Sequence, residues 1–231
     1  MKFKFVFSQI VFISCLFASA CEKADVDYFP LESDQEWQYN LSITTMDGTR
    51  NQKYLQYNFP EFKLEDQTVW PKQIGDGSKI FYTLTEEGVF RFGTITNAGQ
   101  KISENPPSPV LIYPLEVGTS WQKKTTTFLL EKSGPPQDTL FRISEPLLMN
   151  HQIVSTDEIV TVPAGRFERC LKIEAKGQTS ANVGNYIGKI DINVQQTFWY
   201  APDRGLIKSL RVETTNNPSL NRGEYLMELE K

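Results

Sequence analysis

The sequence predicts a mainly β protein with about ten to twelve short antiparallel strands, and three observations support this prediction. Apolar and polar residues alternate with a period of two along most of the chain. Turn-forming pairs such as Asp47-Gly48 and Glu87-Gly88 recur at strand-like intervals. Helical patterns are scarce. The best candidate is a turn or two at residues 146–152, where Pro146 suits the start of a helix.

Residues 1–20 read as an export signal that lies outside the fold. Lys2 and Lys4 form a short basic segment, and the apolar run at 5–17 is too short to span a bilayer and stop there. Small residues at 18–20 provide a cleavage site. We therefore expect the remaining chain to work outside the cytoplasm.

Cys21 is the candidate lipidation site, because it directly follows the cleavage site as in the lipobox of bacterial lipoproteins. Ala18 departs from the leucine that the lipobox favours, so cleavage by ordinary signal peptidase is the alternative; Cys15 is a weaker candidate. Each buried acyl CH₂ contributes about 0.8 kcal/mol, so several chains would tether residues 21–27 to a membrane as a lipidated linker. The resemblance to enteric lipoproteins implies, through Glu22, the outer membrane and a periplasm-facing domain.

The composition of the mature chain limits the classes of partner that we expect it to bind. Removal of residues 1–20 leaves 211 residues, with 22 basic and 28 acidic side chains and a net charge of −6. A nucleic-acid partner is not expected, because that binding requires a basic surface. Cys170 is then the only cysteine besides Cys21, so an internal disulfide is not expected. The sequence indicates no cofactor and leaves the oligomeric state open.

The clearest strands are residues 37–43 and 189–200. Their apolar positions are Trp37, Tyr39, Leu41 and Ile43 in the first, and Ile190, Ile192, Val194, Phe198 and Tyr200 in the second. Alternation of this kind puts one face into a core and leaves the other in water. We expect residues 28–231 to form one antiparallel β domain.

A short pattern occurs twice and suggests two related halves. Pro-Leu-Glu is followed after four residues by Trp-Gln at 30–38 and again at 114–122. A duplication would give halves at 28–105 and 112–231; the alternative is one local solution used twice. The segment 102–114 between them is rich in proline and cannot be a central strand.

Three segments carry a family resemblance: YFPLESDQEWQY at 28–39, TVPAGRFERCLKIE at 161–174 and FWYAPDRGLIKSLRVE at 198–213. They resemble the PLxxGxxW, VPAGxF and WYAPxxGLVK motifs of a broad group of uncharacterised bacterial envelope lipoproteins. We place Gln35 at the usual glycine of the first motif, which Gly118 supplies in the second copy. More distantly, the group is similar to the LolA and LolB lipoprotein carriers. This implies a curved antiparallel sheet or half-barrel with an apolar concave face; a β-sandwich is the alternative.

The motifs are interpreted as fold determinants, and the search for catalytic groups is negative. His151 is the only histidine, so zinc is not expected and a triad with Asp157 would lack a nucleophile elbow. Ser120 and Lys123 match S-x-x-K, but in a strand the two side chains would point to opposite faces. The segment 75–78 is interpreted as a tight turn.

Other residues have competing interpretations. Cys170 is expected on the polar face of its strand as a half-buried, inert thiol, with a reactive thiol as the alternative. Trp199 lies on a polar face, where it packs beneath a loop or contacts a ligand or partner. A hydrolase site would need convergent carboxylates, for which Asp191, Asp203 and Glu213 are the candidates.

These observations favour a non-enzymatic, lipid-anchored protein of the bacterial cell envelope. We expect it to bind an apolar ligand, such as a lipid, or an envelope protein in the hollow of its sheet. A scaffold of an envelope assembly is the first alternative, and a hydrolase with an unrecognised carboxylate site is the second.

Overall fold

The computed structural model describes residues 26–64, 66–134, 139–183 and 188–231. The predicted signal peptide and Cys21 lie outside these ranges, so their roles remain predictions. Within the described residues, no helix has the length and apolar character needed to cross a membrane. The only helical segment found there is a short 3-10 turn, η1 (Pro218–Leu220).

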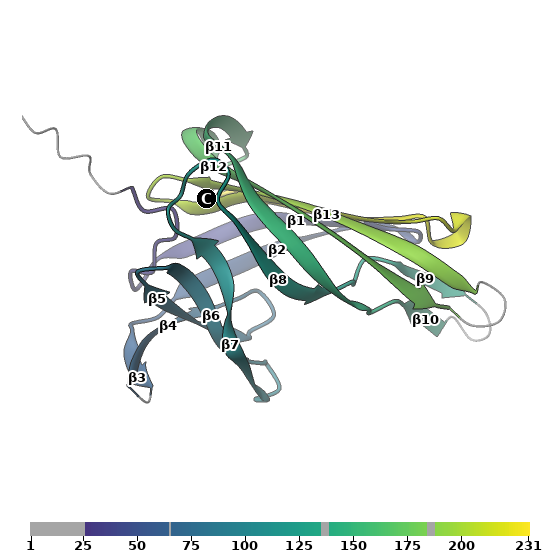
Figure 1. The fold of residues 1–231 in the computed structure, drawn as a ribbon, viewed down its shortest axis with the longest axis horizontal. Coiled ribbons are helices and arrows are strands. Elements are labelled where there is room, and N and C mark those ends of the chain that lie inside the picture. The colour runs from purple at the N-terminus through teal and green to yellow at the C-terminus, as the bar shows by residue number, and fades with distance from the viewer. Residues whose placement is uncertain (1–25, 65, 135–138, 184–187) are drawn as a thin grey trace, which may run out of the picture.

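Strands make up nearly all of the described structure (Figure 1). In chain order they are β1 (Glu36–Thr45), β2 (Gly48–Asn58), β3 (Phe62–Leu64), β4 (Gln67–Gln73), β5 (Lys79–Thr85), β6 (Gly88–Ile95), β7 (Lys101–Ile112), β8 (Ser120–Thr126), β9 (Glu131–Gly134), β10 (Thr139–Arg142), β11 (Pro146–Val162), β12 (Gly165–Asn182), β13 (Lys189–Ala201), β14 (Gly205–Thr215) and β15 (Arg222–Leu229).

One antiparallel sheet contains most of these strands, in the order β7-β6-β5-β4-β2-β1-β15-β14-β13-β12-β11-β8, with β3 paired to β4. The end strands β7 and β8 contact each other without joining the ladder. The sheet is therefore a nearly closed barrel, which confirms the predicted curved antiparallel sheet and goes beyond a half-barrel. A β-sandwich is not formed. The β9-β10 hairpin lies at the far end of the long axis from β4–β7 (Figure 1).

The predicted alternation places side chains as expected in β1 and in most of β13. Trp37, Tyr39 and Leu41 are buried in β1, and Ile190, Ile192 and Val194 are buried in β13. Burial of these side chains supplies much of the stabilisation, since a fully buried large apolar side chain contributes about 1.5–3 kcal/mol. The proline-rich segment forms β7 at the edge of the sheet, which confirms that it is no central strand.

The prediction of a helix at 146–152 is wrong, because this segment forms the first part of the long strand β11. Its buried residues are Leu147, Met149, His151 and Ile153, a strict period of two. Pro146 sits at the first position of the strand, opposite Thr126 of β8, where a missing N–H is tolerated.

In the first copy of the repeated pattern, the residue at the glycine position of the motif is not the predicted one. Asp34, and not Gln35, is the counterpart of Gly118: their φ angles are +64° and +101°. Asp tolerates the left-handed region better than most residues because its short side chain can bond locally. Here Tyr57 donates its hydroxyl to Asp34 Oδ1 at 2.6 Å. Both copies thus make the same kind of turn, while the duplication itself stays a prediction.

The two hairpin motifs occupy the places predicted for them. Gly165 (φ +134°) closes the turn between β11 and β12, and residues 202–204 join β13 to β14. Asp203 and Gly205 both have positive φ in the second turn. The chain segment before β1 packs on this hairpin, since Asp203 N donates to the carbonyl of Asp27 at 2.7 Å.

Candidate functional site

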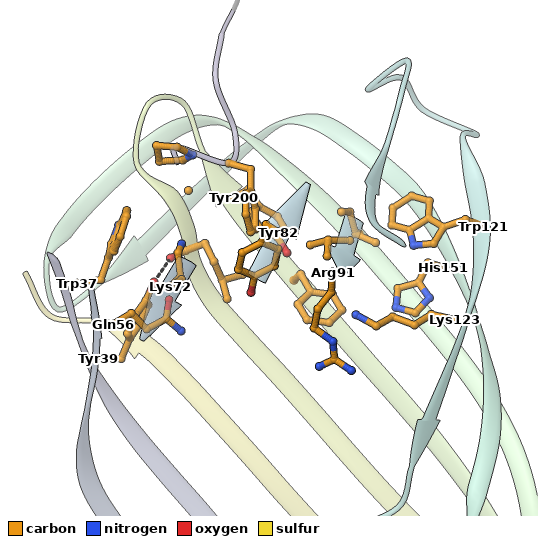
Figure 2. A pocket seen from close by; sticks show the side chains of 17 residues that line it. Trp37, Tyr39, Gln56, Lys72, Tyr82, Arg91, Trp121, Lys123, His151 and Tyr200 are labelled. Atoms are coloured by element: carbon orange, nitrogen blue, oxygen red, sulfur yellow. Dashed lines mark hydrogen bonds between the residues drawn. The ribbon is translucent and has the colours of Figure 1, made fainter. Parts of the chain in front are cut away.

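A cavity of about 160 Å³ lies inside the curved sheet, and the segment that precedes β1 contributes Phe29 and Pro30 to its lining. Strands from nearly the whole circumference contribute to it (Figure 2). Its principal lining side chains are Phe29, Trp37, Tyr39, Gln56, Lys72, Tyr82, Arg91, Trp121, Lys123, His151, Phe198 and Tyr200. Aromatic rings and cations therefore dominate a space that the sequence predicted to be apolar.

The hairpin between β13 and β14 fixes one wall of the cavity. Trp37 donates its indole Nε1–H to the carbonyl of Arg204 at 2.8 Å. Tyr39 donates its hydroxyl to the carbonyl of Leu206 at 2.8 Å. Buried aromatic residues with a polar atom need such partners, so the APDRGL turn positions both rings of β1.

The opposite wall is a stack of three rings. Trp121 of β8 and His151 of β11 are directly opposite in the ladder, and their ring centroids lie 5.4 Å apart with planes 14° from parallel. Phe198 of β13 stacks on the other side of His151 at 6.1 Å. His151 Nδ1 lies 3.3 Å from the carbonyl of Met149. Burial, together with the charge of Lys123, lowers the pKa of His151 to about 4, so the ring is neutral at pH 7.

Trp121 differs from Trp37 in its hydrogen bonding. Its side chain is buried, with 9% of its surface exposed, yet its Nε1–H has no acceptor among the described residues. A buried donor without a partner costs about 1–3 kcal/mol. Figure 2 shows the indole beside His151 at the edge of the cavity.

Lys72 is a buried cation held among rings. Its Nζ lies 4.3 Å from the ring centroid of Trp37 and 4.9 Å from that of Phe29. We find no salt bridge from Lys72 to any residue within the described ranges. Desolvation by burial lowers the pKa of Lys72 to about 7, with Asp27 acting in the opposite direction.

Lys123 and Arg91 bring further positive charge to the cavity. Burial, and the positive charge of Arg91, lower the pKa of Lys123 to about 8. Arg91 forms a salt bridge with Glu104 of β7, which does not itself line the cavity. All the lining residues lie in the described part of the chain, and none of them is Asp or Glu. The cavity is thus electropositive inside a chain with an acidic net charge.

A second cavity of about 710 Å³ lies beside the first, under the segment that precedes β1. Its apolar lining includes Leu31, Trp70, Val89 and Leu111, and Asp27, Glu32 and Glu61 are its acidic residues. Phe29 lines both cavities, and their linings differ: the first has cations and rings, and the second is larger and has acidic groups.

The structure does not bring together the residues of the catalytic motifs that were considered from the sequence. His151 is buried and Asp157, six positions along the same strand, is exposed, so no dyad forms. Ser120 is exposed on β8, whereas Lys123 lines the cavity. Asp76 of the 75–78 turn accepts the N–H of Ser78 at 2.8 Å, as a tight turn requires.

The candidate carboxylates lie apart. Asp191 and Asp203 are exposed, while Glu213 is fully buried. Glu213 pairs with Arg211 at 2.8 Å and accepts the N–H of Leu129 at 3.1 Å. It therefore anchors the segment after β8. Within the described ranges, no group of three or more His, Cys, Asp or Glu residues could hold a metal ion.

Cys170 and Trp199 both lie outside the cavity. Cys170 is fully buried, which corrects the expectation of a half-buried thiol on a polar face. Arg169 has a φ of +54° and the ladder shifts register opposite it, so Cys170 and Leu171 are both buried. Burial raises the pKa of the Cys170 thiol to about 11, so it is inert. Trp199 is half-buried, with Lys208 Nζ 5.7 Å from its ring.

Sequence reasoning missed the cations of the cavity. Lys72, Arg91 and Lys123 come from β4, β6 and β8, and only the curvature of the sheet brings these strands to one space. One signal was available for Trp37 and Trp121, since both are the tryptophan of the repeated pattern and both line the cavity.

Comparisons with known proteins give two solved structures. One is a Bacteroides fragilis protein described as exported and as having a YMCC-like fold: the TM-score is 0.40 and the identity 14%, over 89% of this chain and 98% of that chain. The other is a Parabacteroides distasonis protein described as a lipoprotein, with a TM-score of 0.40 and 13% identity over the same shares. No family model matches the chain. No curated protein matches its sequence.

Proposed function

We propose that this protein is a lipid-anchored protein of the bacterial cell envelope that binds an apolar or amphipathic ligand in the hollow of its sheet. The observation that supports it is the cavity of about 160 Å³ between the Trp37 wall and the Trp121 stack. Ligand sites are concave and lined mainly by apolar and aromatic side chains with a few placed polar groups. The cavity has this composition.

The size of the cavity sets the size of the ligand. An engineered apolar cavity of about 150 Å³ holds one benzene molecule. The cavity therefore accommodates one small ring, either as a whole ligand or as one end of a longer molecule.

Binding can be tested on the full chain carrying Cys21→Ser, which prevents lipidation and avoids detergent. Native mass spectrometry would detect co-purifying molecules, and tryptophan fluorescence would follow titration with indole, toluene and a fluorescent fatty acid. Trp37 and Trp121 line the cavity, so their emission should change on binding. If all three probes fail to bind and nothing co-purifies, the proposal is wrong.

The anchor is a separate part of the proposal. Cleavage before Cys21 and acylation of its thiol and amine would fasten the domain to a membrane, with the outer membrane and a periplasm-facing domain as the proposed location. Mass spectrometry of the processed protein should find the acyl chains, and membrane fractionation should find the protein with the outer membrane. The Cys21→Ser variant should appear in the soluble periplasmic fraction instead.

A scaffold function has one observation in its favour. At the other end of the barrel the interior is filled by its own side chains, among them Leu130, Ile143, Met149 and Ile190. A scaffold would need a partner from the envelope, which a pull-down from intact envelopes would identify. We do not propose hydrolysis, because Asp191, Asp203 and Glu213 do not converge on the cavity.

A further inference from the structure

We infer that the cavity is an organic-acid site: its ligand is a small aromatic acid whose carboxylate or phosphate is held by Lys123 and Trp121, with Lys72 on the facing wall as a second cation (Figure 2). The inference rests on the proposed ligand-binding function and specifies the chemical class of the ligand. Charge, hydrogen bonding and shape support it separately.

The charges that line the cavity have one sign. Lys72, Arg91 and Lys123 all reach it, and within the described part of the chain only Arg91 has a carboxylate partner, Glu104. Burying cations without counter-ions costs stability, since interior charges are normally paired. A bound anion would supply the missing negative charge. A neutral or cationic ligand would leave the cost in place.

Three hydrogen-bond donors of the cavity have no acceptor among the described residues. Trp121 is more than nine-tenths buried, lines the cavity, and has an Nε1–H that finds no acceptor in the described ranges. The Nζ groups of Lys72 and Lys123 can only donate. A carboxylate or phosphate offers several acceptor positions, so one acidic group could satisfy the indole and an ammonium together.

The remaining walls favour a flat apolar body. Phe29, Tyr82, Phe198 and Tyr200 surround the space, and aromatic pairs are stabilised beyond the effect of the area that they bury. The cavity volume of about 160 Å³ matches one ring with a small substituent and excludes a whole acyl lipid. An aromatic carboxylate or a phenyl phosphate has the required shape, charge and acceptor atoms.

The experiment is isothermal titration calorimetry of the full chain carrying Cys21→Ser, with benzoate, phenyl phosphate, benzyl alcohol and benzylamine as probes. We expect at least one of the two acids to bind about tenfold more tightly than benzyl alcohol, because a charge-assisted hydrogen bond contributes roughly 1.5–3 kcal/mol. Benzylamine should not bind. The two acids together decide whether the site prefers a carboxylate or a phosphate.

Variants of neighbouring lysines provide the control. Lys123→Met and Lys72→Met should each reduce the preference for the acid over benzyl alcohol, while binding of benzyl alcohol stays within about twofold. Lys124→Met alters the exposed neighbour of Lys123 on the other face of β8 and should change nothing. Far-UV circular dichroism would establish that each variant is folded.

The outcomes separate the two proposals. Equal binding of benzoate, phenyl phosphate and benzyl alcohol would overturn the acid-site inference and leave ligand binding intact. A preference for the acid that survives both lysine substitutions would also overturn it. Absence of binding by every probe would overturn the inference, and with the fluorescence titrations would defeat the proposed function as well.

Discussion

Trp37 Nε1 donates a 2.8 Å hydrogen bond to the carbonyl of Arg204, so the first strand of the sheet is tied to a hairpin 167 positions later. The neighbouring Tyr39 makes the equivalent bond to Leu206 in the same hairpin. These bonds hold one wall of the cavity, whereas Trp121 on the other wall has no such acceptor in the part of the chain that the structure describes. The two tryptophans of the repeated pattern therefore differ in role: Trp37 is fixed by the fold, and Trp121 has a donor left for a ligand.

Replacing Trp37 by phenylalanine should lower the free energy of unfolding by about 1–3 kcal/mol, because the Arg204 carbonyl loses its partner in a half-buried site. Urea denaturation followed by circular dichroism would measure the change. Trp199→Phe is the control: Trp199 is half-buried on β13 and its side chain makes no hydrogen bond to the described residues, so its effect should be smaller. Equal losses for both variants would show that the Trp37 bond contributes little.

Glu213→Gln should be the most damaging of the conservative carboxylate changes. Glu213 is fully buried against Arg211 and also accepts the N–H groups of Phe128 and Leu129. Removing its charge leaves the Arg211 guanidinium buried and unneutralised, which should cost about 3 kcal/mol of unfolding free energy.

The control for that change is Glu224→Gln, which breaks the pair with Arg222 on the surface. Exposed pairs contribute about 0–1 kcal/mol, so little change is expected. Chemical denaturation of both variants at pH 7 would measure the difference, and a Glu213→Gln variant as stable as Glu224→Gln would contradict the structural role assigned to Glu213.

The sequence was sufficient for the strands and insufficient for the cavity. Period-two alternation identified β1 and most of β13 because one face of each is buried and the other is wet. The same signal was present in Leu147, Met149, His151 and Ile153, but Pro146 suggested a helix start and hid it. Local turn chemistry likewise predicted the hairpin at 202–205, because the proline and the glycine that form the turn lie within four residues of each other.

Two other errors, the burial of Cys170 and the cations of the cavity, come from features that no local pattern encodes. The left-handed φ of Arg169 shifts the register of β12 and buries Cys170, which a strict alternation places on the polar face. The cavity depends on curvature, which brings Lys72 and Lys123 to a common space although 51 positions separate them in the chain. Lysines in strands are usually solvated, so nothing in the sequence distinguished these two.

His151 should make the protein sensitive to mild acid. Its pKa is about 4 in the folded protein and 6.5 in a reference histidine, because burial and the charges of Lys123 and Arg211 oppose protonation among Trp121 and Phe198. The unfolded chain binds this proton more readily, so stability is complete above pH 6.5 and falls as the pH drops towards 4.

The loss between these pH values should be about 3 kcal/mol, and His151→Phe should remove it while keeping the ring stack. Urea unfolding of both proteins at pH 4.5, 5.5 and 7.5 would measure it. The carboxylates titrate in the same way in the wild type and in the variant. The contribution of His151 is therefore the difference between their two curves of unfolding free energy against pH. Parallel curves for wild type and variant would rule out His151 as the source of acid sensitivity.

Lys72 should cost the protein stability at neutral pH. Its pKa is about 7 in the folded state and 10.5 in the reference state, because burial among Phe29, Trp37 and Tyr82 outweighs the favourable effect of Asp27. The unfolded chain holds more protons between these values, so the stability of the wild type rises as the pH increases from 7 to 10.5. Without ligand, Lys72→Met should therefore be more stable at pH 7, by on the order of 4 kcal/mol.

That advantage should shrink towards pH 10, where Lys72 is neutral in the folded protein, and Lys124→Met should have no comparable advantage at either pH. Chemical denaturation at pH 7 and pH 10 would measure both differences. A variant that is more stable yet has lost the preference for an acidic ligand would place Lys72 among residues whose placement favours binding at the expense of stability. A Lys72→Met protein less stable than the wild type at pH 7 would instead mean that the surrounding rings compensate the buried ammonium fully.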